Sequence, residues 1–127
     1  MDTSVTQNQR RVLVADDEKL IADTLRMILA QSGFHAEAVY DGSSAIEKAE
    51  EWKPDILVCD VIMPDINGID VAIRIRTLIP GCRILLLSGQ AGVNDLMRDA
   101  REQGHQFDLL VKPVYPGDLL NLLRSSV

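Results

Sequence analysis

The chain has 127 residues, of which 46% are hydrophobic but only 4% aromatic, so its length suits one domain with an aliphatic core. Its formal net charge of -6 argues against nucleic acid or an anionic membrane as a direct partner, since both bind basic surfaces. The sequence has no apolar run near the roughly 18 residues of a membrane span and no signal peptide at its start, which predicts a cytoplasmic protein.

Residues 1–10 are polar and aperiodic, which predicts a flexible leader ahead of a single domain over 11–127. From Arg11 onward, short apolar runs alternate five times with longer segments of helical period, a pattern typical of βα units around a parallel sheet. We expect strands at 12–15, 36–39, 56–59, 84–87 and 109–111. Four of them are nearly continuous apolar runs, as in strands covered on both faces, whereas 36–39 alternates and is expected at an edge.

The segments between these runs place apolar side chains at helical spacing. Glycines at 33, 81 and 104 and prolines at 54 and 80 stand where the helices should end. The sequence therefore predicts a doubly wound (βα)5 α/β fold with a five-stranded parallel sheet. The apolar positions that define the helices are Ile21, Leu25, Ile28 and Leu29; Ile46 and Ala49; Val71, Ile75, Leu78 and Ile79; Val93, Met97 and Ala100; and Leu119, Leu122 and Leu123.

Polar residues directly follow four of the five expected strands. In open parallel sheets, ligands bind outside the carboxyl ends of the strands, so these positions are the candidates for chemistry. If the four strands are neighbours, one pocket holds several carboxylates, a hydroxyl and an ammonium group. The residues are Asp16, Asp17 and Glu18 after the first strand, Asp60 after the third, Ser88 and Gly89 after the fourth, and Lys112 and Pro113 after the fifth.

Such a cluster of carboxylates needs a bound cation or a raised pKa, because two of them about 4 Å apart repel by about 4 kcal/mol at an effective dielectric near 20. An all-oxygen shell favours Mg²⁺, with water and a phosphate completing its coordination. A carboxylate can also attack phosphorus and form an aspartyl phosphate, while a metal and a lysine neutralise the charge. This set of carboxylates, hydroxyl and ammonium group therefore indicates phosphoryl transfer. Turns at 63–64 and 67–68 are expected to bend the chain over the site.

Each of these residues also has an ordinary explanation. Asp17 could cap the first helix, and Asp60 could belong to a turn. Ser88 could lie in a plain loop, and Lys112 could be a solvated charge. Together, these explanations would require four strand ends to carry a complementary phosphate-and-metal set by accident.

The motifs VLVADDE, ILVCDVIMPDINGID, ILLLSG and LLVKP resemble the receiver domain of bacterial response regulators, the CheY-like family of two-component systems, over residues 11 to about 124. The resemblance implies a sheet of order 2-1-3-4-5. It also implies that a sensor histidine kinase or phosphotransfer protein phosphorylates Asp60. The implied Mg²⁺ ligands are Asp17, Asp60, the backbone carbonyl of Ile62 and, through a bound water, Asp16; Ser88 and Lys112 contact the phosphoryl group, and the Lys112-Pro113 bond is cis.

The sequence departs from the family pattern near its fifth strand. Receiver domains usually carry Tyr or Phe three residues before the lysine, where this chain has Leu109, and Phe107 is displaced by two residues. We therefore expect the loop 88–92, freed by Gly89, and the helix 93–103 to carry the conformational switch. The face that this helix forms with the fifth strand and the last helix is expected to bind a downstream protein or an output domain.

Two other functions compete with this interpretation. Haloacid-dehalogenase-type phosphohydrolases use the same groups but place a second Asp two residues after the nucleophile, where this chain has Ile62. The sequence therefore predicts a phosphoacceptor that catalyses only its own phosphorylation and slow dephosphorylation. A receiver-like module that never uses phosphate generally lacks one of the acidic pair, the acceptor or the lysine, and this chain has all four.

The sequence also makes predictions about residues away from the site. Cys59 ends the third strand and Cys82 precedes the fourth, so both are expected to be core thiols at opposite ends of the sheet, too far apart for a disulfide. Trp52 precedes the third strand and should lie far from the site.

Overall fold

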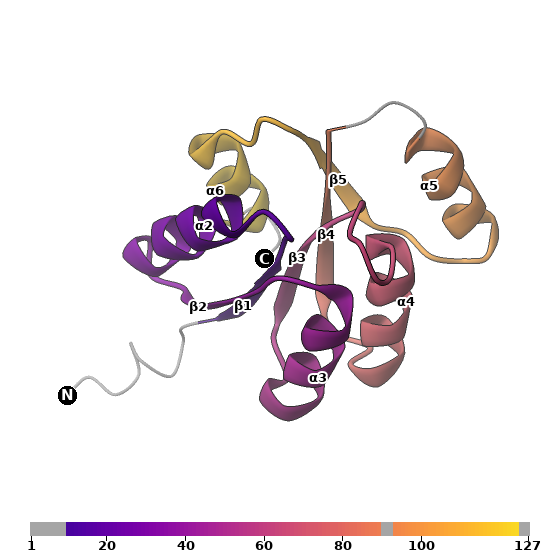
Figure 1. The fold of residues 1–127 in the computed structure, drawn as a ribbon, viewed down its shortest axis with the longest axis horizontal. Helices are drawn as coiled ribbons and strands as arrows, with labels where there is room; N and C mark the ends of the chain where they lie inside the picture. Colours follow the sequence, from indigo (N-terminus) through magenta and orange to yellow (C-terminus); the bar gives the residue numbers. More distant parts are fainter. Residues whose placement is uncertain (1–9, 90–92, 125–127) are drawn as a thin grey trace.

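The computed structural model describes residues 10–89 and 93–124, in which five parallel strands form one sheet with helices on both faces (Figure 1). The order is β2-β1-β3-β4-β5, which confirms the predicted topology and the edge position of the second strand. The strands are β1 (Arg11–Ala15), β2 (His35–Val39), β3 (Ile56–Asp60), β4 (Arg83–Ser88) and β5 (Asp108–Val111).

Burial of the strands follows their place in the sheet. All five residues of β3 and five of the six in β4 are buried, because helices cover both faces of these central strands. The apolar run of β5 was expected to be covered on both faces, and this expectation is wrong. β5 is the other edge strand, and its last residue, Val111, is 70% exposed.

Two helical layers enclose the sheet, one on each face (Figure 1). Residues of β1 alternate between the layers, with Val12 and Val14 in one core cluster and Leu13 and Ala15 in the other. Full burial of a valine or leucine side chain in these clusters contributes about 1.5–3 kcal/mol to folding. The first layer contains α2 (Lys19–Gln31) and α6 (Pro116–Arg124), and the second contains α3 (Gly42–Trp52), α4 (Gly68–Leu78) and α5 (Val93–Glu102).

Most helix ends follow the predicted signals. Gly33 and Gly104 adopt positive φ angles of 99° and 93° just after α2 and α5. Lys53, with φ of 55°, ends α3 ahead of Pro54. Gly81 has no left-handed conformation, and α4 ends three residues earlier.

One apolar position of α4 was misplaced by the helical pattern. Leu78 was expected in the buried stripe but is 40% exposed. Ile75 is fully buried, and Ile79, four residues further on, packs against the core. Leu78 therefore lies at the border of the stripe, where the helix ends.

The start of the chain meets the sheet at Arg10. The leader expected over 1–10 lies outside the described residues except for Arg10, whose carbonyl accepts a hydrogen bond from His35 N (2.9 Å).

Cys59 and Cys82 are buried free thiols, as predicted, and burial raises the pKa of Cys82 to about 11. The β3–β4 register separates them by about four residues along the strands, roughly 13 Å. Over the described part of the chain, no helix has the length and apolar character needed to cross a bilayer.

Candidate phosphoacceptor site

Four neighbouring strands deliver the predicted residues to one edge of the sheet. Asp60 and Ser88 are the last residues of β3 and β4, while Asp16 and Lys112 directly follow β1 and β5. Backbone hydrogen bonds extend the sheet past the strand ends, including Lys112 N to Ser88 O at 2.7 Å. The structure therefore brings together the side chains that the sequence placed at separate strand ends.

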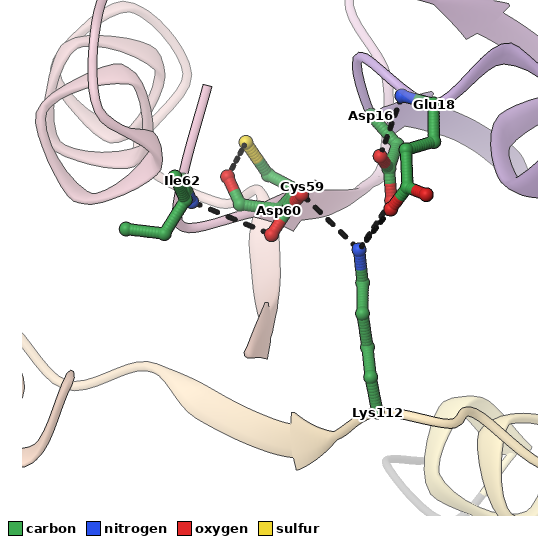
Figure 2. Close-up of polar contacts among 6 residues, drawn as sticks. All are labelled: Asp16, Glu18, Cys59, Asp60, Ile62 and Lys112. Carbon is green, nitrogen blue, oxygen red and sulfur yellow. Dashed lines mark hydrogen bonds and ion pairs between the residues drawn. The ribbon is translucent and has the colours of Figure 1, made fainter. Parts of the chain in front are cut away.

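Lys112 is the centre of the cluster (Figure 2). Its Nζ donates hydrogen bonds to Oδ2 of Asp16 (3.0 Å) and Oδ2 of Asp60 (3.1 Å), and lies 3.6 Å from Oε1 of Glu18. Asp16 is fully buried, Asp60 is 6% exposed, and the lysine side chain is 16% exposed. At an effective dielectric of about 20, each contact near 3 Å is worth roughly 5 kcal/mol of Coulomb attraction before the cost of desolvation.

The charges at this edge perturb one another. Burial and then the neighbouring Asp16 raise the pKa of Asp60, and the Lys112 ammonium and the Ile62 N–H offset only part of that effect. Burial acts to lower the pKa of Lys112, but its hydrogen bonds to Asp16 and Asp60 prevail and raise it overall. The lysine is therefore firmly cationic, while the ionised form of Asp60 is under-compensated.

The carboxylates fit a hard divalent cation. One oxygen from each of Asp16, Asp17 and Asp60 lies within 4.8 Å of the others, close enough to share an ion directly or through a bound water. Ile62 N lies 3.4 Å from Oδ1 of Asp60, which holds the backbone of Ile62 at the site. A hollow of about 280 Å³ opens over these groups, lined by Asp17, Glu18, Asp60, Ile62, Gly89 and Lys112.

The ordinary explanations for two of these residues do not hold. The N-cap of α2 is Glu18, which makes no side-chain cap hydrogen bond, and its N–H donates to Oδ1 of Asp16 (3.0 Å). Asp17 therefore caps no helix and is left to face the hollow. Lys112 is mostly buried between carboxylates rather than solvated.

Ser88 and its following loop are described only at their beginning. Ser88 is 4% exposed at the end of β4, and Gly89 passes so close to Lys112 that an added Cβ would lie 3.6 Å from the lysine Cβ and Cδ. The rest of the loop expected to move, 90–92, lies outside the described residues. The Lys112-Pro113 peptide is cis, as predicted.

Gly68 has a role that its turn motif did not reveal. A Cβ at this position would lie 2.0 Å from the carbonyl oxygen of Asp60, and Gly68 N donates to Val61 O at 2.7 Å. Only glycine permits this approach, because a side chain would displace the backbone that carries the Asp60 carboxylate. The expected turn is therefore a close packing contact against the end of β3.

Asp65 is a second residue that the sequence did not single out. Its Oδ1 accepts from Gly42 N (2.9 Å), and its Oδ2 accepts from Ser43 N and Oγ (both 3.0 Å). These hydrogen bonds, chiefly the one from Gly42 N, hold the pKa of Asp65 well below its usual range. The loop after Asp60 is thus tied to the first turn of α3, where Asp41 also caps Ser44 N (2.7 Å).

The displaced aromatic lies far from the site. Leu109 packs partly buried against the core, whereas Phe107 precedes β5 at the opposite end of the strand. Its ring stacks on His105 (6.0 Å between centroids) and carries the guanidinium of Arg76 at 5.3 Å. Phe107 therefore does not supply the ring missing at 109.

A larger apolar hollow adjoins the site. It has a volume of about 710 Å³ between α2 and the segment joining β5 to α6, and it shares Gly89 and Lys112 with the acidic hollow. Leu20, at its rim, is 81% exposed. The hollow over the Asp60 carboxylate therefore borders a wide apolar surface.

Comparison with known proteins gives a consistent result. Residues 12–124 match the family model of the response regulator receiver domain. The chain is 36% identical over 114 residues to the probable transcriptional regulatory protein TcrX of Mycobacterium tuberculosis, covering 90% of this chain and 48% of that protein. It is 32% identical over 119 residues to the DNA-binding response regulator MtrA of Mycolicibacterium smegmatis, covering 94% and 51%. The chain thus spans about half the length of these curated relatives.

Solved structures share the whole fold. A CheY-like receiver domain protein from Methanospirillum hungatei superposes with a TM-score of 0.83 at 25% identity, covering 92% of each chain. The chemotaxis protein CheY4 of Vibrio cholerae gives 0.81 at 27% identity, covering 94% of this chain and 99% of that one.

Proposed function

Because the chain belongs to the response regulator receiver domain family, we propose that Asp60 accepts a phosphoryl group from a sensor histidine kinase or phosphotransfer protein, in a reaction that requires Mg²⁺. The chain is a receiver domain of a two-component response regulator, a signalling domain rather than a classical enzyme. Its family implies a histidine kinase as partner. The observation that carries the assignment of Asp60 is its position at the end of β3, bonded to Lys112 and within reach of two further carboxylates.

The residues of the site divide the chemistry between them. A carboxylate oxygen of Asp60 attacks phosphorus, the P–N bond to the donor imidazole breaks, and its electron pair stays on the imidazole nitrogen. Lys112, already 3.1 Å from Asp60, neutralises the phosphoryl oxygens, and the Ser88 hydroxyl donates to one of them. Mg²⁺ held by Asp16, Asp17, Asp60 and the Ile62 carbonyl would supply positive charge for the same oxygens.

The donor protein reaches Asp60 beside the apolar hollow along α2. This hollow and the acidic one share Gly89 and Lys112, so a protein that delivers a phosphoryl group to Asp60 must cover part of it. The exposed side chain of Leu20 offers apolar area there for such a contact.

The site is built to retain the phosphoryl group rather than to release it. Ile62 puts an apolar, half-exposed side chain where the hydrolases carry their acid/base. Glu18 lines the hollow but lies 3.6 Å from the Lys112 ammonium, which disfavours a role as a general base. Dephosphorylation is therefore expected to be slow, as a switch requires.

The signal is expected to leave through α5. Leu109 has no ring to swing, so phosphorylation shifts the receiver between two states through the 88–92 loop and α5, and the face of α5, β5 and α6 binds the downstream partner. A cytoplasmic location stays a prediction. The absence of direct nucleic-acid contact by this chain also stays a prediction, because the relatives that are DNA-binding regulators are about twice its length. Backbone NMR with a beryllofluoride phosphate mimic tests the route. Large shifts over 88–98 with small ones at Leu109 support it, and shifts confined to α2 and α3 contradict it.

Intact-mass measurement tests the acceptor directly. Acetyl phosphate with Mg²⁺ should add one phosphoryl group to the chain, and Asp60→Asn should abolish the addition. Asp118→Asn, which removes an exposed carboxylate from α6, is the matched control and should label normally. Unchanged labelling of the Asp60 variant would refute the assignment, and turnover of a phosphate monoester that depends on Asp60 would favour a phosphohydrolase.

A further inference from the structure

A second polar hollow lies at the opposite end of the sheet from the acceptor. Its volume is about 420 Å³, and it lies between the last turns of α4 and α5 and the beginnings of β4 and β5. Ser88 lies five residues after Arg83 along β4, a distance of roughly 17 Å. The hollow is lined by arginines from three different elements, Arg76, Arg83 and Arg101, together with Phe107 and Asp108.

One of the three arginines, Arg83, already donates a hydrogen bond from each of its three side-chain nitrogens. Arg83 donates from Nε and Nη2 to Oδ2 of Asp108 (3.2 and 3.1 Å) and from Nη1 to Leu122 O (2.8 Å). This pair neutralises Asp108. The carboxylate in the lining is therefore not available to balance the other two guanidinium groups.

Arg76 and Arg101 keep unused donors. Toward the described residues, Arg76 engages only its Nε, which donates to Cys82 O (3.1 Å), and it lies over the ring of Phe107. Arg101 forms no hydrogen bond or ion pair with any described residue. The hollow thus concentrates two uncompensated positive charges in a chain whose net charge is -6.

Helix ends explain only part of this arrangement. Arg76 and Arg101 each stand in the last turn of a helix, where a cation interacts favourably with the helix dipole. That effect would be satisfied by two arginines pointing into solvent separately. It does not account for their convergence with Arg83 on one hollow of a size typical of small-molecule sites, roughly 300–1,000 Å³.

We propose that this hollow binds a phosphate-bearing small molecule of the pyrophosphate type, held by Arg76 and Arg101. The planar guanidinium fork matches two phosphate oxygens, and two separate forks suit two linked phosphate groups. One face of Phe107 carries His105 and a guanidinium lies against the ring as well, so recognition rests on the anion rather than on stacking. This site is independent of the phosphoryl transfer proposed for Asp60.

Calorimetric titration with sodium pyrophosphate tests the proposal, in low salt with EDTA so that no Mg²⁺ sequesters the probe. Arg101→Gln and Arg76→Gln should each weaken binding by about tenfold or more, the loss expected for charge-assisted hydrogen bonds. Arg98→Gln removes the same charge from an exposed position of α5, where the side chain pairs with Asp95 (3.3 Å), and should change binding by less than about twofold.

Two further measurements keep the result interpretable. Thermal unfolding checks that each variant is folded, and backbone NMR should place the pyrophosphate shifts at 101–108 rather than at 88–89 and 112. Absence of binding at about 1 mM pyrophosphate, equal weakening by Arg98→Gln and Arg101→Gln, or shifts centred on Lys112 would each overturn the proposal. Failure here leaves the labelling of Asp60 untouched, so the two proposals are tested separately.

Discussion

The two ends of the sheet handle charge in opposite ways. At the carboxyl end, the buried Asp16 and Asp60 share one ammonium, that of Lys112. At the amino end, the carboxylate of Asp108 lies at the surface and has its own partner, the guanidinium of Arg83. Each end carries hydrogen bonds of similar length, but only the carboxyl end buries more negative than positive charge.

This difference separates an ion pair that contributes to stability from a buried carboxylate cluster that is suited to a ligand. Paired, half-exposed groups add modestly to stability and need nothing else. Buried like charges cost free energy until a cation joins them, and that cost is typical of functional sites. Substitutions at the two ends should therefore have different, and in one case opposite, effects.

Replacement of one glycine at each end gives the largest expected contrast. Gly68→Ala would force a Cβ to within 2.0 Å of Asp60 O and should lower the free energy of unfolding by about 3 kcal/mol or more. Gly81→Ala, ahead of β4, meets no atom within 4 Å and has no positive φ, so it should change stability by less than about 0.5 kcal/mol. Urea unfolding measures both, and equal losses would show that the Gly68 turn relaxes freely.

Removal of one carboxylate at each end should shift stability in opposite directions. The raised pKa of Asp60 means that folding disfavours its ionised form, so Asp60→Asn should raise the unfolding free energy at pH 7 without Mg²⁺, by about 1 kcal/mol. Asp108→Asn removes the partner of Arg83 and should lower it by about 0.5–1 kcal/mol. Urea unfolding in EDTA decides this. If both variants lose stability, the charges at the carboxyl end are balanced within the chain.

Asp65 is the exception at the carboxyl end, because its carboxylate already has hydrogen-bond partners. Its substitution should change the free energy of unfolding by less than the substitutions above, and the change should depend on pH. Its folded pKa is lowered, so its stabilisation is fully present above the unfolded carboxyl pKa of about 3.9 and is lost as the pH falls through the folded value. Asp65→Asn should therefore destabilise the protein near pH 7, with the difference from wild type shrinking on acidification. Glu47→Gln, an exposed position of α3, is the charge-matched control. A difference that stays constant from neutral to acid pH would contradict the hydrogen-bonding account.

Local sequence predicted those features that depend on local pattern. The apolar runs placed the ends of the five strands to within one residue, and the pattern was clearest for the central strands, because a strand covered on both faces must be apolar along its length. Asp16, Asp60, Ser88 and Lys112 were placed in one pocket because they follow neighbouring parallel strands.

Features that depend on contacts between distant segments were missed. The bonds from Asp65 to Gly42 and Ser43 join residues that no periodicity relates, and the close approach of Gly68 to Asp60 depends on how the loop packs. The exposure of β5 was misjudged because an apolar run at the edge of a sheet resembles one at its centre.

Trp52 should show the smallest effect, which is no response at all to events at the acceptor site. Its ring lies against His35 (5.4 Å), Arg11 (5.7 Å) and Lys48 (5.5 Å), and the first two begin β2 and β1 at the amino end. Its fluorescence should therefore stay unchanged on addition of Mg²⁺ or beryllofluoride. Unfolding in urea removes these contacts and is the positive control.

The absence of a response would itself be informative, because α3 connects the two ends. Its first turn is held by Asp65 beside the acceptor loop, and its last residue is Trp52. If the loop after Asp60 moved α3 as a rigid body on phosphorylation, the ring would shift against His35 and Arg11, and its emission would change. A constant emission therefore restricts the conformational change to other elements, as expected if α5 carries it, whereas strong quenching by the phosphate mimic would show that α3 carries the signal to the amino end.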